Sequence, residues 1–313
     1  MQLLRHLGDL PQAVHERGSV VTIGSFDGIH AGHRQLLDRV IRKSKSLGVP
    51  SIVMSFEPTP EEFLSKDHPP ARLMRFREKY EALAAYGIDI FYCPRFSSKV
   101  RNIRAADFIR QVLSQGLNLR HIVVGDDFRF ARRREGTVEH LQRVHRVLGF
   151  GIEQASSLVK DDIRVSSTAI RLALANGNPG RAATLLGRPY QMSGRIVRGR
   201  QVGRTLGYPT ANVDLKRRLS PVMGIYAVRV TGLPEGCLDG VASIGTRPTF
   251  DLVKPLLEVH LFDFDRDIYG DYISVDFIAH LRDEVKFDSV EELVAQMDED
   301  AENARFSLKA SDA

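Results

Sequence analysis

The chain changes its pattern near residue 187, and this change constrains the fold more than any other feature of the sequence. Before that point, short runs rich in β-branched residues alternate with stretches of helical periodicity. Such alternation is typical of crossover units that build a parallel sheet covered on both faces. The length of 313 residues also favours two hydrophobic cores over one. We therefore expect two domains, residues 1–187 and 188–313.

The first part predicts an α/β domain. Apolar runs predict strands over residues 20–24, 51–56, 88–92 and 121–125, and helical spacing predicts helices over residues 33–46, 75–86, 105–114 and 138–148. Ligands of such sheets bind where strands end and helices begin, so the turns after the strands are the candidate sites.

The second part predicts an antiparallel domain. Segments 192–198, 225–231, 240–244, 256–262 and 272–279 are separated by glycine and proline turns, and some alternate polar with apolar residues. Close spacing without intervening helices favours an antiparallel barrel or sandwich. A final helix is expected from Ser289, with Glu292 three residues later as its capping partner.

Composition and charge narrow the classes of function. No apolar run approaches eighteen residues, and the N-terminus, interrupted by Arg5, His6 and Asp9, lacks the apolar block of a signal peptide. Two distant cysteines suggest neither a zinc site nor a disulfide framework, which favours a cytoplasmic location. The first domain carries a net charge of +9 and the second −4. The basic half predicts an anionic partner, either a polyphosphate ligand or nucleic acid.

The turn GSFDGIHAGH, residues 24–33, is the first candidate site. Its glycines allow close approach of the backbone to a ligand, and the N-terminus of the following helix attracts anions. His30 and His33 could donate hydrogen bonds to phosphate oxygens at this end. The alternative is a pair of surface histidines that cap a helix. A zinc site of the HEXXH type is absent.

Three later segments could support this site. They are FEPTP at 56–60, VVGDDFRF at 123–130 and the hydroxyl-rich VSSTAIR at 165–171. Each also has a simpler interpretation, as a proline turn, a loop ion pair and an ordinary helix cap.

The segment 195–212 is the second candidate site. Gly199, Gly203 and Gly207 recur every four residues and could supply backbone donors for phosphate. Thr210 and Asn212 alternate on an extended segment, and two hard oxygens on one face suit Mg²⁺. The alternative is a basic turn whose polar residues face solvent.

Glu258 lies among the polar residues of the alternating segment LLEVHLF. A carboxylate in such a set is usually solvated, but at a barrel mouth it could take a proton from an attacking hydroxyl. No GxxxxGK[ST] sequence occurs, so phosphate binding would need a different cradle.

These motifs, in this order, resemble the bacterial bifunctional riboflavin kinase/FAD synthetase family. The first four resemble its FMN adenylyltransferase module, and the segments GIYAV, VASIGTRPTF, LEVHLFDFD and LRDEVKFDSVEEL resemble its riboflavin kinase module. The resemblance implies a Rossmann-like HxGH nucleotidylyltransferase domain followed by a six-stranded antiparallel β-barrel with a C-terminal helix. It implies ATP, riboflavin and FMN as substrates and Mg²⁺ as cofactor.

The resemblance also implies roles for individual residues. His30 and His33 would contact the ATP phosphates, and Glu258 would be the base that activates the ribityl 5′-hydroxyl. Thr210 and Asn212 would position Mg²⁺–ATP. The other expected contacts of the first module are Gly24, Ser25, Phe26, Asp27, Gly28, Phe56, Pro58, Gly125, Asp127, Phe128, Arg164, Ser166, Ser167, Thr168 and Arg171. Those of the second are Gly199, Gly203, Arg204, Gly207 and Pro209.

In the first module the chain departs from the family pattern at two positions: Ser25 often corresponds to asparagine and Ala131 to glycine. In the second module the stretch 250–254 lacks glycines that the family often carries. Two alternatives stay open: that only one activity is retained, or that the basic half binds nucleic acid. No motif supports nucleic-acid binding, so we expect neither a nucleic-acid nor a membrane partner. Either a monomer or a weak homo-oligomer is compatible with the sequence.

Overall fold

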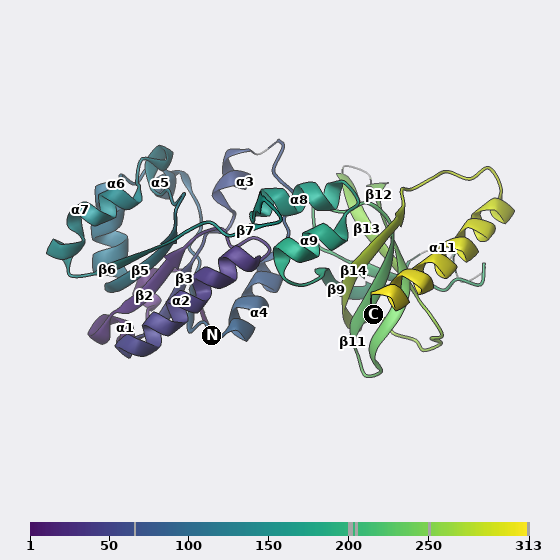
Figure 1. Cartoon of the computed structure of the whole chain (residues 1–313), viewed down its shortest axis with the longest axis horizontal. Helices are drawn as coiled ribbons and strands as arrows, with labels where there is room; N and C mark the ends of the chain where they lie inside the picture. The colour runs from purple at the N-terminus through teal and green to yellow at the C-terminus, as the bar shows by residue number, and fades with distance from the viewer. Residues whose placement is uncertain (66, 200–202, 204–205, 250–251, 312–313) are drawn as a thin grey trace. The chain divides into compact units, whose positions relative to one another are not determined.

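The computed structural model describes residues 1–65, 67–199, 203, 206–249 and 252–311 (Figure 1). It contains two compact units: Met1–Pro70 with Met74–Val165, and Ala71–Leu73 with Ser166–Ala313. None of the helices in these described ranges combines the length and apolar character needed to cross a membrane.

A six-stranded parallel sheet forms the centre of the first unit. The parallel sheet is as the sequence predicts, and the strands Gln2–Leu4 and Gly151–Ala155 add to the four predicted ones. Its strands run in the order β1-β4-β3-β2-β5-β6. The order reverses at β2, so the loops after β2 and β5 flank the point where ligands of such sheets bind. The strands are β1 (Gln2–Leu4), β2 (Ser19–Ile23), β3 (Ser51–Met54), β4 (Ile90–Tyr92), β5 (Leu119–Gly125) and β6 (Gly151–Ala155).

Helices cover both faces of this sheet, because alternate strand residues face opposite layers. Val20 packs in one apolar cluster with residues of α2 and α4, whereas Val21 packs in another with residues of α1, η2 and α7. The helices are α1 (Gln12–Arg17), α2 (Ala31–Leu47), α3 (Pro60–Leu64), α4 (Phe76–Tyr86), α5 (Ser98–Arg101), α6 (Ala105–Asp107), the π-helix η2 (Phe108–Gly116), α7 (Val138–Leu148) and the 3₁₀ turns η1 (Leu7–Asp9) and η3 (Arg132–Arg134). A short hairpin, β7 (Val159–Lys160) with β8 (Ile163–Arg164), follows β6.

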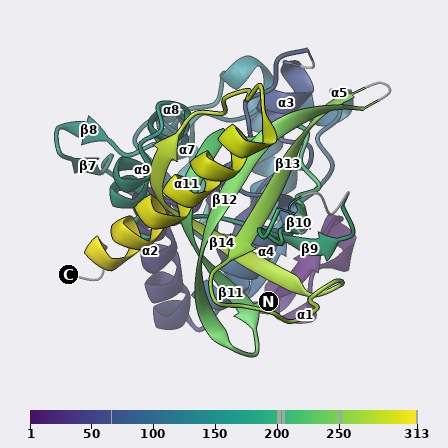
Figure 2. The same ribbon diagram turned by 90° about the vertical axis from the view of Figure 1, so that its right-hand side faces the viewer.

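A closed antiparallel barrel forms the centre of the second unit, and α11 lies across its outer surface (Figure 2). The predicted six strands and C-terminal helix are confirmed. In barrel order the strands are β10 (Ala211–Asp214), β13 (Leu252–Leu261), β12 (Gly236–Thr249), β11 (Gly224–Leu233), β14 (Tyr272–Arg282) and β9 (Tyr190–Val197). The helices are α8 (Ser167–Ala175), α9 (Pro179–Leu186) and α11 (Val290–Ala310), which Ser289 caps by accepting from the Glu292 amide.

The contact-based division falls at Val165–Ser166, earlier than the sequence-based boundary at residue 187. The reason is that α9 packs on strands β9 and β14 of the barrel. The short segment Ala71–Leu73 also belongs to the second unit, where the Arg217 guanidinium donates to the Arg72 and Leu73 carbonyl oxygens at 2.6 and 3.3 Å.

Ala131 has a backbone conformation that favours glycine, with φ 65° and ψ −166°. Such a conformation costs a residue with a Cβ about 1–3 kcal/mol. We expect Ala131→Gly to raise the free energy of unfolding by about 1 kcal/mol, measured by urea denaturation. The control is Ala82→Gly, which changes a half-buried alanine inside α4 and should lower it by about the same amount. A loss of stability in Ala131→Gly would contradict the strain at this position.

Candidate active sites

The turn between β2 and α2 is held by buried side chains. Phe26 and Ile29 adopt positive φ angles of 48° and 42°, and their side chains are 0 and 3% exposed. Burial of two large apolar groups offsets the strain of these conformations. Gly28 has a φ of 87°, a conformation that glycine adopts readily because it has no Cβ. A Cβ on Gly24 would lie 3.2 Å from the Phe26 ring. The turn is therefore fixed by the fold.

His30 and His33 are brought together at the N-terminus of α2, as predicted. Their rings stack with centroids 3.6 Å apart, and His30 caps the helix because its Nδ1 accepts the His33 amide N–H at 3.2 Å. This hydrogen bond assigns the proton of a neutral His30 ring to Nε2. His30 can thus act as a donor toward an anion at the helix end.

His33 has a strongly perturbed ionisation. Its Nδ1 is inaccessible to solvent and has no hydrogen-bond partner among the described residues. Burial, followed by the charges of His30 and Lys79, lowers the pKa of His33 well below its usual value of 6.5. The imidazole is therefore neutral near pH 7.

The loops after β3 and β5 lie at the same edge of the sheet as this turn, because the strands are parallel. Phe56, after β3, packs edge-on against Phe96 at 5.4 Å. After β5, Asp127 is paired with Arg164 of β8 at 2.5 Å, and Phe128 stacks on Phe130. The other predicted residues at this edge are Ser25, which is exposed, Asp27, which is buried and accepts the Met74 amide at 2.9 Å, the half-buried Pro58, and Gly125, the last residue of β5.

The four remaining residues predicted for the first site belong to the second compact unit. Ser166 caps α8 by accepting the Ala169 amide at 3.1 Å, and Ser167 and Thr168 begin the helix. The Arg171 Nε donates to the Ala71 carbonyl at 2.7 Å. The simpler interpretation of VSSTAIR as a helix cap is thus confirmed, and its contact with ATP stays a prediction.

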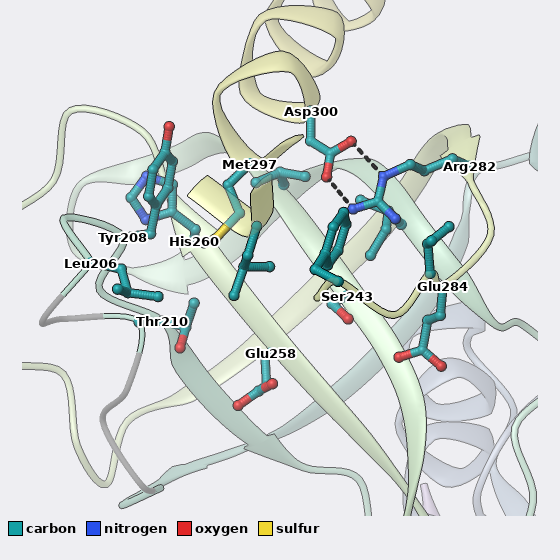
Figure 3. Close-up of a pocket in the computed structure, with 16 residues that line it drawn as sticks. Leu206, Tyr208, Thr210, Ser243, Glu258, His260, Arg282, Glu284, Met297 and Asp300 are labelled. Carbon is teal, nitrogen blue, oxygen red and sulfur yellow. Dashed lines mark hydrogen bonds and ion pairs between the residues drawn. The ribbon is translucent and has the colours of Figure 1, made fainter. Parts of the chain in front are cut away.

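A cavity of about 410 Å³ lies between the barrel surface and α11 (Figure 3). Glu258 lines it, together with Thr210 and Gly203. Figure 3 shows Thr210, Glu258 and Glu284 toward one end and the Arg282–Asp300 pair at the other. The lining residues that sequence reasoning missed are Leu206, Tyr208, Ile225, Val241, Ser243, His260, Arg282, Glu284, Val285, Phe287, Leu293, Met297 and Asp300.

Glu258 faces outward from the barrel. Its neighbours Leu257 and Val259 are fully buried inside, so the intervening side chain must point to the face that α11 covers. Across the ladder Glu258 pairs with Asn212 of β10 on one side and with Ser243 of β12 on the other. These three polar residues therefore form a row on one face of the sheet.

Gly199 lies beside Asn212 of this row, and Gly203 lies beside Thr210. A Cβ on Gly199 would lie 2.6 Å from the Asn212 amide carbon, and one on Gly203 would lie 3.4 Å from the Thr210 hydroxyl. Gly207 has a φ of 84° with open space around it, and the Pro209 carbonyl accepts from His260 Nδ1 at 2.9 Å. Arg204 lies outside the described residues.

Hydrogen bonds and an ion pair hold the walls of the cavity. Arg282 and the buried Asp300 form a bidentate pair at 2.8 and 2.7 Å, which joins the end of β14 to α11. Tyr208 donates to Asp298 of α11, and its pKa rises to about 12, through burial and then this hydrogen bond. Partial burial, followed by the charge of Glu258, raises the pKa of Glu284. The cavity therefore combines an apolar wall with two carboxylates at one end.

The donor set fits Mg²⁺ that arrives with a nucleotide. No cluster of three His, Cys, Asp or Glu that could hold a metal occurs among the described residues. The Thr210 hydroxyl and the Asn212 amide supply hard oxygens, and Mg²⁺ takes few protein ligands while it keeps waters and phosphate oxygens. These two residues could complete such a shell.

Comparisons with known proteins match both halves of the chain. A family model described as FAD synthetase matches residues 12–169, and one described as riboflavin kinase matches residues 186–308. A bifunctional riboflavin kinase/FMN adenylyltransferase of Escherichia coli (strain K12) is 46% identical over 97% of each chain. The chain belongs to the bifunctional riboflavin kinase/FMN adenylyltransferase family.

Members of this family from other bacteria are similar to this chain over almost its whole length. Those of Pseudomonas fluorescens and Haemophilus influenzae are 42 and 40% identical over 97% of this chain and 97 and 98% of their own. A crystal structure named as a macrolide-efflux protein from Streptococcus pneumoniae shares the fold, with a TM-score of 0.84 and 32% identity over 97% of this chain and 98% of its own. The resemblance stated from the motifs is confirmed.

The lowered pKa of His33 predicts a stability effect below pH 6.5. In the unfolded chain this histidine takes up a proton near its usual pKa, whereas in the folded chain it does not, so the free energy of unfolding falls as the pH drops. From pH 6.5 to 5.5 this contribution is about 1 kcal/mol. We expect His33→Gln to remove this part of the fall in the free energy of unfolding, which urea denaturation at the two pH values measures.

The control is His15→Gln, which replaces an exposed histidine of α1. It should keep the pH dependence of the unmodified chain. An equal fall with pH in His33→Gln and the unmodified chain would show that His33 does not ionise as described.

Proposed function

We propose that this chain, a bifunctional riboflavin kinase and FMN adenylyltransferase, divides its activities between two sites. Residues 188–313 would convert riboflavin and ATP to FMN and ADP, and residues 1–187 would convert FMN and a second ATP to FAD and pyrophosphate. The observation that carries this division is that the two family matches fall on separate ranges, each with its own candidate site.

For the kinase, the cavity under α11 would hold riboflavin. Its volume is within the range of small-molecule sites, and its apolar wall of Leu206, Leu293 and Met297 suits a planar ring system. Glu258 would accept the proton of the ribityl 5′-hydroxyl as this oxygen attacks the γ-phosphorus. Mg²⁺, held with ATP by Thr210 and Asn212, would supply charge neutralisation for the transferred phosphoryl group. The loop glycines 199, 203 and 207 and Pro209 would approach the nucleotide with their backbone.

For adenylyl transfer, the end of α2 would bind the ATP phosphates. The FMN phosphate oxygen would attack the α-phosphorus directly, and the bond to pyrophosphate would break. His30 Nε2–H and the helix N-terminus would stabilise the charge that develops on this leaving group. No covalent enzyme intermediate is required.

Two substitutions should separate the activities. Glu258→Gln should slow FMN formation about 10²–10⁴-fold, because the base is lost while the shape is kept. Conversion of FMN to FAD should persist in that variant. His30→Ala should have the reverse pattern. Chromatography of the flavins formed from riboflavin or FMN with Mg²⁺–ATP measures both steps.

Each variant serves as the control of the other. Loss of both steps in a folded Glu258→Gln protein would contradict the independence of the sites. Formation of neither FMN nor FAD by the unmodified chain would contradict the proposed function itself.

The Mg²⁺ role predicts an effect of Thr210→Val, which keeps the side-chain shape and removes the hydroxyl oxygen. The Mg²⁺ concentration for half-maximal FMN formation should rise about tenfold, with little change in the KM for riboflavin. An Mg²⁺ titration at saturating ATP measures this. A rise only in the KM for riboflavin would assign Thr210 to the flavin instead of the metal.

A further inference from the structure

A buried lysine lies behind the turn that carries the two histidines. Lys79, in the first turn of α4, is only 4% exposed, and its Nζ donates to the Ser25 carbonyl at 2.5 Å. A buried ammonium group strongly destabilises a fold unless polar groups compensate it. None of the roles described above uses this charge, which makes its position next to the anion-binding turn informative.

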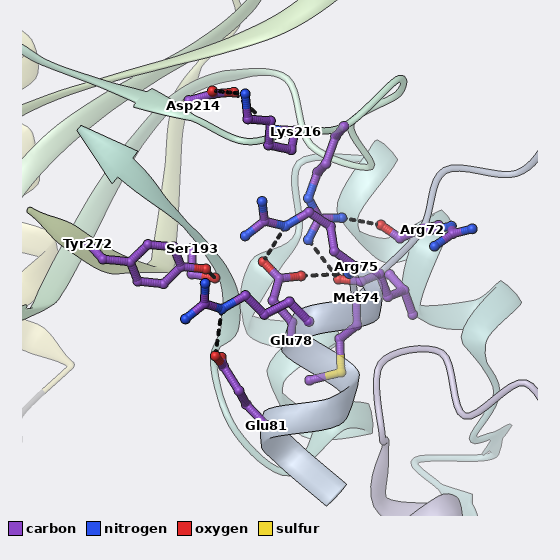
Figure 4. Close-up of polar contacts among 12 residues, drawn as sticks. Arg72, Met74, Arg75, Glu78, Glu81, Ser193, Asp214, Lys216 and Tyr272 are labelled. Carbon is purple, nitrogen blue, oxygen red and sulfur yellow. Dashed lines mark hydrogen bonds and ion pairs between the residues drawn. The ribbon is translucent and has the colours of Figure 1, made fainter. Parts of the chain in front are cut away.

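The start of α4 is tied to the same turn a second time. At the start of the helix the Glu78 carboxylate accepts from the Arg75 amide at 2.7 Å and from the Arg75 Nε at 3.3 Å (Figure 4). One residue earlier, the Met74 amide donates to Asp27 at 2.9 Å. The segment 74–79 therefore holds the turn at two points, through the carboxylate of Asp27 and the carbonyl of Ser25.

Lys79 also acts electrostatically on His33. The ionisable groups that bear on His33 are His30, in the same turn, and Lys79, from α4. Both disfavour a positive charge on His33, in the same direction as burial. A fixed cation at this place also makes the potential at the end of α2 more positive.

We propose that Lys79 is a positioning residue for adenylyl transfer, which fixes the turn through the Ser25 carbonyl and places a buried positive charge behind it. This inference rests on the assignment of FMN adenylyltransferase to the first domain. In this proposal the ammonium group does not itself contact the substrate. It acts through Ser25 and His33. In its absence the turn loses a hydrogen bond, and His33 is protonated at higher pH.

The test uses the full chain with Lys79→Met, which removes both the donor and the charge, and Lys79→Gln, which keeps a donor for Ser25. Lys45→Met, at the exposed end of α2, removes the same charge from the surface as a control. Three quantities are measured: kcat/KM for FMN to FAD as a function of pH, the titration midpoint of the His33 ring by NMR, and riboflavin kinase activity.

We expect Lys79→Met to lower kcat/KM for FAD formation about 10–100-fold and to raise the His33 midpoint, with kinase activity unchanged. Lys79→Gln should raise the midpoint as much but lose less activity, because a donor to Ser25 remains. Should Lys79→Met fail to fold, Lys79→Gln carries the test. Lys45→Met should match the unmodified chain.

An unchanged His33 midpoint in a folded Lys79 variant would overturn the proposal, whatever its activity, because a merely structural lysine would leave the titration in place. A shifted midpoint with unchanged FAD formation would overturn it as well. Absence of FAD formation by the unmodified chain would instead contradict the proposed function, and the NMR titration would still test the electrostatic effect of Lys79 on His33.

Discussion

Both candidate sites follow from one constraint, the alternation of side chains between the two faces of a β-strand. In the first unit helices bury both faces of the sheet, with Val20 and Val21 of β2 in opposite apolar clusters. Polar chemistry is therefore restricted to the ends of the strands. In the barrel, Leu257 and Val259 fill the interior, so Glu258 must face outward. A carboxylate there would be solvated without a cover, and α11 supplies that cover. The same rule of strand geometry thus produces a site at a sheet edge in one unit and a site on an outer barrel surface in the other.

The first site is held in place by the packing around its turn. Phe26 and Ile29 accept positive φ angles because their side chains are buried, and the helix cap at His30 fixes the orientation of one ring. Donors that need no rearrangement stabilise developing charge more effectively than mobile ones. Lys79 belongs to this organisation, since it bonds the carbonyl of the same turn from inside the protein.

The second site depends on contacts between distant parts of the chain. The bidentate Arg282–Asp300 pair joins β14 to α11, and Tyr208 reaches the same helix through Asp298. Removing one partner of a buried pair leaves an uncompensated charge and is strongly destabilising. The pair therefore favours the position of α11 in which Asp300 reaches Arg282. These contacts place the apolar wall opposite the row of Asn212, Glu258 and Ser243, which gives one cavity both a surface for a ring system and a carboxylate.

The sequence by itself determined the parallel sheet, the antiparallel strands, the final helix and the histidine pair, because these depend on local periodicity and on residues three apart. It also identified Glu258 as a member of a polar set. Tertiary structure alone decided that this set faces α11, because strand alternation does not say which face is inside. Arg282 and Asp300 enter the second cavity through a contact between β14 and α11, and sequence spacing carries no signal for such a contact. Likewise, only the fold brings Lys79, some fifty residues further along the chain, behind the turn at Ser25. Residues distant in sequence meet where burial of apolar surface brings their elements together, and that is a property of the packed molecule.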